Sequence, residues 1–201
     1  MSRKESPEIN AGSMADIAFL LLIFFLVTTT MDVESGIIRK IPKKEKITEN
    51  IRIKEKNILE VNINLRNELF IDGEIVKLND VKQIAIDFID NAGGLDQNNT
   101  PCNWCKGKQL STSSDHPSKA FISVKTDRTA NYETYISVLD HLNAAYTHLR
   151  NRLGVNLYNQ NYESLLDDFK KSNQQDKSIA VKIKNLREKY PLLLSDADMQ
   201  N

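Results

Sequence analysis

The feature that most limits how this chain can fold is an apolar run near its amino terminus, residues 14–31. Between Ile17 and Val27 the run contains no polar side chain. As a helix rising about 1.5 Å per residue it would be about 27 Å long, close to the hydrocarbon thickness of a bilayer. Nothing else in the chain is apolar enough to surround such a helix in a globular core. The run therefore predicts a single transmembrane helix over residues 14–31.

A cleaved signal peptide is the main alternative, because it would also place basic residues before an apolar stretch. Arg3 and Lys4 do precede the run, but Glu5 and Glu8 cancel their charge. Residues 28–32 read Thr-Thr-Thr-Met-Asp, which is a poor site for a protease that needs small residues. We therefore favour an uncleaved anchor preceded by a short polar tail, residues 1–13.

The rest of the chain has the composition of a soluble domain. With 27 basic and 27 acidic side chains in 201 residues, no bulk charge favours nucleic acid binding. That length allows one membrane anchor and one domain of ordinary size. Residues 32–57 are charged and contain the run Lys-Lys-Glu-Lys at 43–46, which is typical of a solvated linker.

Residues 58–157 show the pattern of a small two-layer α/β (α+β) domain. Leu59, Val61 and Ile63 alternate with polar residues, which predicts a half-buried strand. Residues 68–76 predict its hairpin partner, in which Asp72-Gly73 marks either a turn or a bulge.

Two helices and a third strand are expected to complete this domain. Asn79 predicts the N-cap of a first helix, and Gly93-Gly94 its stop. A strand over 121–124 and a second helix starting at Asn131 follow. The side chains expected on the buried faces of the two helices are Val81, Ile84, Ala85, Phe88 and Ile89, then Tyr132, Ile136, Leu139, Leu142 or Asn143, Tyr146 and Leu153.

Two segments fall outside this core pattern. Residues 95–119 are rich in turn-forming residues and show no periodicity, which predicts a long inserted loop that carries both cysteines. Residues 158–201 predict a helical C-terminal extension, with helical patterns over 163–171 and 179–190 before Pro191 and an acidic tail. The pattern leaves open whether this extension packs on the domain.

Asp16 is the residue most informative about function. An ionised carboxylate inside hydrocarbon costs several kcal/mol unless a partner, water or a proton satisfies it. Since burial favours the protonated form of a carboxyl group, such a residue can take up and release a proton. Alternatively, Asp16 lies only two residues into the run and could be an interfacial anchor or a charge at the helix N-terminus. Position alone leaves both interpretations open.

The residues around Asp16 resemble the signature of the ExbD/TolR biopolymer-transport family. Residues 9–29 contain the Ile-Asn pair, a short gap, the Asp and then an aliphatic and aromatic helix that ends in hydroxyl residues. Ile41-Pro42 and residues 124–132 are also similar to family motifs, and the resemblance covers most of residues 9–154 outside the cysteine loop. The C-terminal tail is similar to the extension of ExbD-type proteins from Bacteroidetes-like bacteria. The Pro often found just before the Asp is missing here.

The resemblance implies a subunit of a bacterial inner-membrane motor. Two copies of the helix, as a homodimer, would sit inside a pentameric channel partner of the ExbB/TolQ/MotA type, and Asp16 would take up protons. A periplasmic energy transducer of TonB or Tol type would receive the movement. Thr28 and Thr29 could lie near a proton path, although hydroxyls at a helix end usually bond to their own backbone. The resemblance implies no enzyme activity, no cofactor and no metal.

The orientation implied by the resemblance conflicts with the distribution of basic residues. The family places the amino terminus in the cytoplasm and the domain in the periplasm. On the positive-inside rule the topology would be inverted, because residues 39–46 carry more Lys and Arg than residues 1–13. We follow the family, because Asp32 and Glu34 directly flank the run and because assembly with a partner can override a weak charge bias.

Cys102-Asn-Trp-Cys105 has the spacing of a redox pair, of half a zinc site or of a short structural disulfide. A redox motif should open a helix, whereas this one lies among turn formers, and zinc would find only His116 as a nearby further ligand. We expect a disulfide that staples the loop in an oxidising periplasm. His141 and His148 lack a third ligand and are expected to be surface or packing residues, and Asp127-Arg128 is expected to cap a turn.

Several hypotheses about function remain at this point. The first is an ExbD-like motor subunit that energises transport across the outer membrane through a TonB-type protein, and a TolR-like role in envelope integrity is close to it. A membrane-tethered periplasmic redox or binding module that uses Cys102 and Cys105 is the alternative from another class. A flagellar-stator role is weaker, since no recognisable peptidoglycan-binding domain follows the linker.

Overall fold

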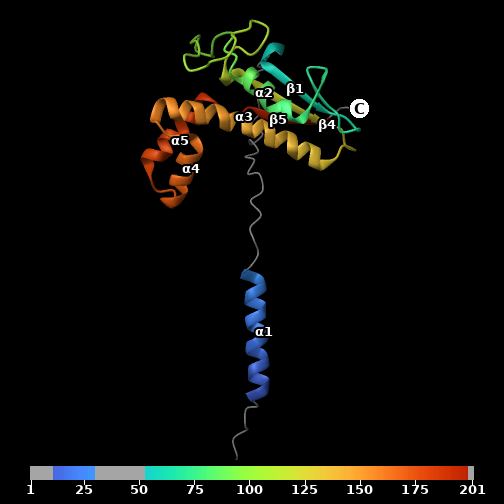
Figure 1. Ribbon diagram of the computed structural model, residues 1–201, viewed down its shortest axis with the longest axis vertical. Helices are drawn as coiled ribbons and strands as arrows, with labels where there is room; N and C mark the ends of the chain where they lie inside the picture. Colours follow the sequence, from blue (N-terminus) through green and yellow to red (C-terminus); the bar gives the residue numbers. More distant parts are fainter. Residues whose placement is uncertain (1–10, 30–52, 199–201) are drawn as a thin grey trace, which may run out of the picture. The chain divides into compact units, whose positions relative to one another are not determined.

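The computed structural model describes residues 11–29 and 53–198 (Figure 1). The chain divides into two compact units, residues 1–50 and 51–201, and each is described here by itself. Residues 1–10 of the predicted tail, the last two residues of the predicted span and residues 32–52 of the predicted linker lie outside the described residues.

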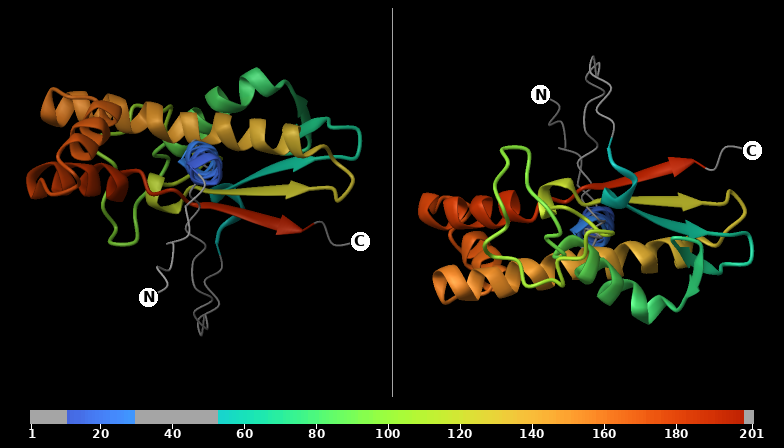
Figure 2. Two further views of the ribbon diagram at one scale, coloured as in Figure 1. Left: turned by 90° about the horizontal axis from the view of Figure 1, so that it is seen from below. Right: turned by 90° about the horizontal axis from the view of Figure 1, so that it is seen from above.

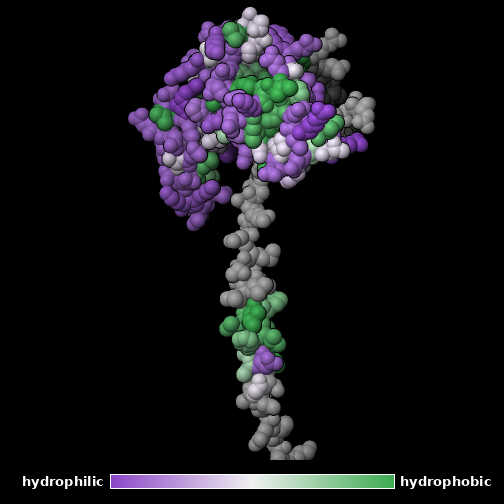
Figure 3. Space-filling model, turned by 45° about the vertical axis from the view of Figure 1, so that its right-hand side comes forward, coloured by the Kyte–Doolittle hydropathy of each residue, from purple (hydrophilic) through white to green (hydrophobic). Residues whose placement is uncertain are grey.

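The first unit contains the helix α1, Ala11–Thr29. The described side chains of this helix are exposed, and Ile17, for example, is 58% exposed. Hydrophobic side chains cover most of the visible surface of α1 (Figure 3). No helix among the described residues is long and apolar enough to cross a membrane. The predicted span continues to Met31, which lies outside the described residues.

The second unit is built on a five-stranded sheet with the order β3-β2-β1-β4-β5. β1 pairs antiparallel with β2 and parallel with β4, while β4 and β5 are parallel. The strands are β1 Ile58–Ile63, β2 Leu69–Ile71, β3 Glu74–Val76, β4 Phe121–Thr126 and β5 Leu194–Asp198. In β1 every second residue is buried, as its alternating sequence predicts.

The segment predicted as a single hairpin partner of β1 forms two strands, β2 and β3. Between them Asp72 has φ 49° and Gly73 has φ 87°. Two successive positive φ values are the geometry of the tight turn that matches the twist of a two-stranded hairpin. Asp72-Gly73 is therefore a turn and not a bulge.

Two helices cover one face of this sheet, α2 Leu78–Ile89 and α3 Tyr132–Tyr158 (Figure 2). Val81, Ala85 and Ile89 of α2 are fully buried, as are Leu142 and Leu149 of α3. The prediction of a small two-layer α/β domain is confirmed. Tyr132, however, was wrongly placed in the buried stripe, because it is the first residue of α3 and is 73% exposed.

The second helix was expected to start at Asn131, and the first was expected to have Asn79 as its N-cap. Asn131 caps α3, since its side chain accepts a hydrogen bond from the Glu133 amide. Asn79 is not an N-cap, because α2 begins one residue earlier, at Leu78, where the Asp80 amide donates to the carbonyl of Lys77. The backbone thus starts the helix without a side-chain cap at this position.

The C-terminal extension packs on the domain. Its helices α4, Tyr162–Lys171, and α5, Lys177–Lys189, bury Leu165, Ile183 and Leu186 in the same hydrophobic core as the sheet. The two predicted helical patterns form α4 and α5, whereas the acidic tail, for which no strand was predicted, forms β5 on the edge of the sheet. Pairing with the open edge of β4 satisfies the backbone of this segment, which its polar side chains alone do not predict.

The packing of the extension gives a prediction for Leu186. Leu186→Ala should lower the free energy of unfolding by about 2 to 3 kcal/mol, because it leaves a cavity at a fully buried position. Val181→Ala on the same helix is the matched control, since Val181 is 65% exposed. Denaturant unfolding of the full chain in detergent micelles measures both changes. Equal, small effects would mean that α5 does not pack on the core.

Candidate functional site

The first candidate site is Asp16, in the second turn of α1. It is the one ionisable residue in a helix otherwise made almost entirely of apolar and small residues. Its side chain is exposed, as are the described apolar side chains that follow it, from Ile17 to Phe25. Thr28 and Thr29 form the last turn of α1, but their side chains lie outside the described part of the chain. The predicted role of these threonines therefore stays a prediction.

The second candidate site is the loop between α2 and β4, which carries a disulfide. Cys102 and Cys105 are bonded to each other, with 5.6 Å between their Cα atoms, and both are half-buried. Neither cysteine of the chain is free. The pair lies among turns and bends rather than at the start of a helix.

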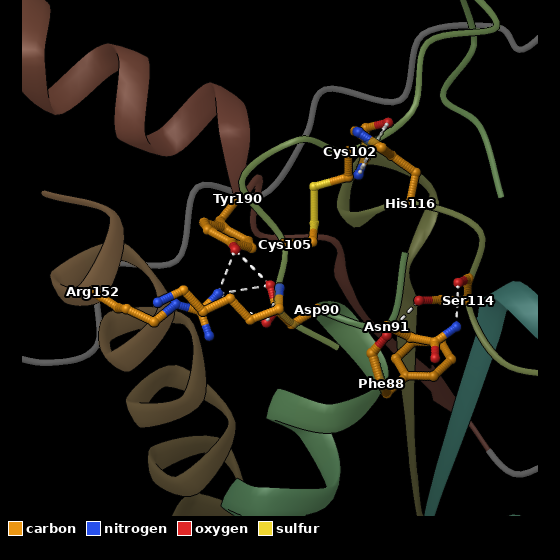
Figure 4. The surroundings of a disulfide bond; sticks show 11 residues. Phe88, Asp90, Asn91, Cys102, Cys105, Ser114, His116, Arg152 and Tyr190 are labelled. Atoms are coloured by element: carbon orange, nitrogen blue, oxygen red, sulfur yellow. Dashed lines mark hydrogen bonds and ion pairs between the residues drawn. A yellow bond between two sulfur atoms is a disulfide. The ribbon is translucent and has the colours of Figure 1, made fainter. Parts of the chain in front are cut away.

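Buried polar groups at the end of α2 hold this irregular loop in place. The Asn91 side chain donates to the carbonyls of Leu110 and Ser114, at 2.9 and 2.8 Å, and accepts from the Leu110 amide at 2.9 Å. The Ser114 hydroxyl donates to the carbonyl of Phe88 (Figure 4). One asparagine thus supplies the hydrogen bonds that the loop backbone cannot make as a strand or helix.

The prediction that Gly93-Gly94 stops α2 is wrong, because the helix already ends at Ile89. The amides of Gly93 and Gly94 instead donate to the carbonyls of Ser114 and Asp115, at 3.0 and 2.9 Å. A Cβ at either glycine would collide with the loop, at the Leu110 carbonyl or the Asp115 carboxylate. These glycines let the loop lie directly against the chain that follows α2.

The far end of the loop is fixed to the start of β1 by Asp115. The Asn57 side chain donates to its carboxylate at 3.2 Å and accepts from its amide at 2.7 Å, and Lys56 Nζ lies 2.6 Å from Oδ1. Burial of Asp115 opposes ionisation, but the hydrogen bonds from Lys56 and Asn57 outweigh it and lower the pKa of this carboxyl. Asp115 is therefore a paired structural carboxylate.

The buried carboxylate of Asp90 joins four segments of the second unit. Asp90 follows α2 and is 3% exposed. Arg152 Nη2 of α3 lies 2.8 Å from both carboxylate oxygens, the Tyr190 hydroxyl donates to Oδ1 at 2.6 Å, and the Lys106 amide donates to Oδ2 at 3.0 Å. Figure 4 shows Arg152 and Tyr190 converging on Asp90. We call Asp90, Lys106, Arg152 and Tyr190 the Asp90 cluster.

The Asp90 cluster is a structural assembly. Burial, together with the hydrogen bond to Asp90, raises the pKa of the Tyr190 hydroxyl, so it stays protonated and donates. Arg152 Nη2 also donates to this hydroxyl, at 2.9 Å. No pattern in the sequence identified this cluster, because its members lie up to 100 residues apart.

The three histidines of the chain, His116, His141 and His148, lie in the described part of the second unit. No group of three or more His, Cys, Asp or Glu side chains suited to a metal ion occurs among the described residues. His116 packs edge to face against Trp104, with 5.5 Å between ring centroids, and burial lowers its pKa. His141 is half-buried and His148 is exposed on α3. Asp127 caps a turn as predicted, by accepting from the amide and hydroxyl of Thr129.

The disulfide gives a prediction for thiol counting. Alkylation of the denatured full chain, purified without reductant, should label no thiol, because Cys102 and Cys105 are bonded to each other. The same treatment after reduction should label both cysteines. Mass spectrometry counts the labels, and two free thiols before reduction would show that the bond does not form in the cell.

The family comparison covers the first candidate site and most of the second unit. A family model described as biopolymer transport protein ExbD/TolR matches residues 2–154. The match includes Asp16 on α1 as well as β1 to β4, α2 and most of α3, whereas α4, α5 and β5 lie outside it. No curated protein matches the chain.

Proposed function

Because the chain belongs to the ExbD/TolR family of biopolymer transport proteins, we propose that it is an ExbD-like subunit of an inner-membrane motor driven by the proton-motive force. The observation that carries this proposal is Asp16, the one ionisable residue of α1, inside the matched region. Its side chain is exposed within the described part of the chain, so contacts of the chain with itself do not explain a carboxylate at this place.

The proposal requires α1 to be the membrane anchor. A helix of 19 residues is about 28 Å long at 1.5 Å per residue, which is close to the thickness of the hydrocarbon layer. The apolar sequence also continues beyond the described side chains, to Met31. Lipid, or the helices of a partner, would cover the apolar side chains that the chain itself leaves exposed.

Asp16 would be the moving part of the motor. When protonated it is neutral and tolerated by apolar surroundings, and when ionised it needs a polar partner or water. One charge that moves across the membrane potential yields about 2.3 kcal/mol per 100 mV. Cycles of protonation could therefore drive movement of the helix against its partner.

The partners follow from the family. ExbD/TolR proteins generally work with ExbB/TolQ and TonB/TolA partners. For this chain we propose a homodimer whose two helices lie inside a pentameric channel subunit of the ExbB/TolQ/MotA type, with a TonB-type periplasmic protein as the energy transducer. A TolR-like role is the second candidate, because the matching family model covers both kinds of protein. A deletion strain that takes up nutrients normally but leaks periplasmic protein would favour the TolR-like role.

The proposed orientation places the amino terminus in the cytoplasm and the second unit in the periplasm. Protease added to intact spheroplasts should then cleave within residues 60–150, because this region would face the medium. Spheroplasts opened with detergent are the control. If the domain resists the protease there as well, its fold and not its location explains the resistance. Cleavage only after opening would reverse the topology, as the charge distribution around the run suggests.

A further inference from the structure

The disulfide loop and the C-terminal extension meet at two adjacent residues of the extension. Trp104 lies between the bonded cysteines, and Lys189 Nζ is 3.8 Å from the centroid of its ring. Lys106, directly after Cys105, donates its amide to Asp90, which accepts the hydroxyl of Tyr190 on its other oxygen. Trp104, just before Cys105, therefore contacts Lys189. Lys106, just after Cys105, bonds to the same carboxylate, Asp90, that accepts the hydroxyl of Tyr190.

These contacts lie where α5 passes into β5. α5 ends at Lys189, Tyr190 is its C-cap, and β5 begins at Leu194. Tyr190 is fully buried, and its carbonyl accepts from Arg150 Nη2 at 2.7 Å. The contacts that hold Tyr190 in place therefore also fix the start of β5, the edge strand.

We propose that the Cys102–Cys105 disulfide is a redox latch for the C-terminal extension, by which we mean that the extension docks firmly on the domain only while this bond is intact. The bond holds the turn from Cys102 to Cys105, which places Trp104 under Lys189 and the Lys106 amide on Asp90. Opening the turn releases both contacts and weakens the docking of α5 and β5. The inference concerns the second unit alone and is independent of the role of Asp16.

The redox step is reduction of the disulfide by a dithiol. Two electrons and two protons convert the S–S bond into two thiols, and the dithiol becomes a disulfide. A half-buried pair is within reach of such a reagent. The buried bonds of Asn91 and Asp115 do not involve residues 102–106, so the rest of the loop stays fixed after reduction.

Hydrogen–deuterium exchange of the full chain in detergent micelles, with and without dithiothreitol, tests the latch. Reduction should make the amides of α5 and β5 exchange about tenfold faster. A tenfold change corresponds to about the free energy that one hydrogen bond to a charged group contributes. The amides of β1 and α2 should not change. The Cys102→Ser, Cys105→Ser double variant should behave like the reduced chain in either condition.

Two tyrosine variants test whether the effect of reduction reaches the C-terminal extension or stays within the disulfide loop. Tyr190→Phe removes the hydroxyl that links the extension to Asp90, so α5 and β5 should exchange faster than in the wild type even when oxidised, and their response to dithiothreitol should shrink to what the Trp104–Lys189 contact contributes. Tyr162→Phe is the matched control, because its hydroxyl bonds Arg187 within the extension and does not contact Asp90. This control should keep the response. A change on reduction confined to residues 95–119 would overturn the proposal.

Discussion

Replacing Asp16 with asparagine is expected to abolish energised transport while the subunit still inserts into the membrane and assembles with its partners. Asparagine has nearly the same shape but cannot bind and release a proton at this position. Every other residue of α1 would be unchanged, so the packing of the helix should be preserved. Uptake of a substrate that needs the proton-motive force measures the loss, and co-purification of the partner subunit measures assembly.

Asp32→Asn is the matched control for this variant. It makes the same chemical change at the carboxylate that directly follows the apolar run, to which the proposed mechanism gives no role in proton transfer. Transport should remain near the wild-type rate. Normal transport in the Asp16→Asn variant would overturn the proposed mechanism.

The two cysteines allow the motor hypothesis to be tested against the alternative hypothesis, a redox or binding module. If Cys102 and Cys105 carried the principal function, the Cys102→Ser, Cys105→Ser double variant would lose activity and Asp16→Asn would not. The motor account predicts the reverse order of effects, with transport near zero in Asp16→Asn and largely retained in the double variant. The two variants therefore discriminate the two classes of function in one assay.

Replacing Asp90 with alanine is expected to cause the largest loss of stability in the second unit, about 4 kcal/mol, as when one partner of a buried ion pair is removed. Arg152, which is 23% exposed at its side chain, would lose its carboxylate. Its Nε already lacks a hydrogen-bond partner within the described residues. Tyr190 and the Lys106 amide would lose their acceptor at the same time.

Denaturant unfolding of the full chain in micelles measures this loss. Asp87→Ala is the matched control, three residues before Asp90 in α2, because the Asp87 side chain is exposed and accepts a hydrogen bond from Gln83. Its effect should stay within about 0.5 kcal/mol, as for most surface substitutions. Equal effects of the two variants would mean that the Asp90 cluster does not stabilise the fold.

Much of the second unit could be predicted because its elements have a clear period. Leu59, Val61 and Ile63 show the two-residue repeat of a strand buried on one face, and α3 shows a helical repeat over many turns. β5 could not be predicted in this way. Its sequence, Leu-Ser-Asp-Ala-Asp, lacks apolar alternation, and it is a strand because β4 presents an open edge.

Asp16 and the Asp90 cluster differ in the same respect. Asp16 stands out in the sequence because a charge within an apolar run is a local contrast. Asp90 lies in an ordinary amphipathic pattern, and only the fold brings Arg152 and Tyr190 to it from positions 62 and 100 residues away. A buried ion pair between distant residues leaves no local signal.

Proton conduction by the reconstituted complex tests the central claim most directly. The full chain and its channel-forming partner would be placed in liposomes with an imposed membrane potential, and a dye inside would report the pH. The account predicts proton entry with the wild-type chain and entry at the rate of empty liposomes with Asp16→Asn. Equal proton entry with the two chains would contradict the claim that Asp16 carries the proton.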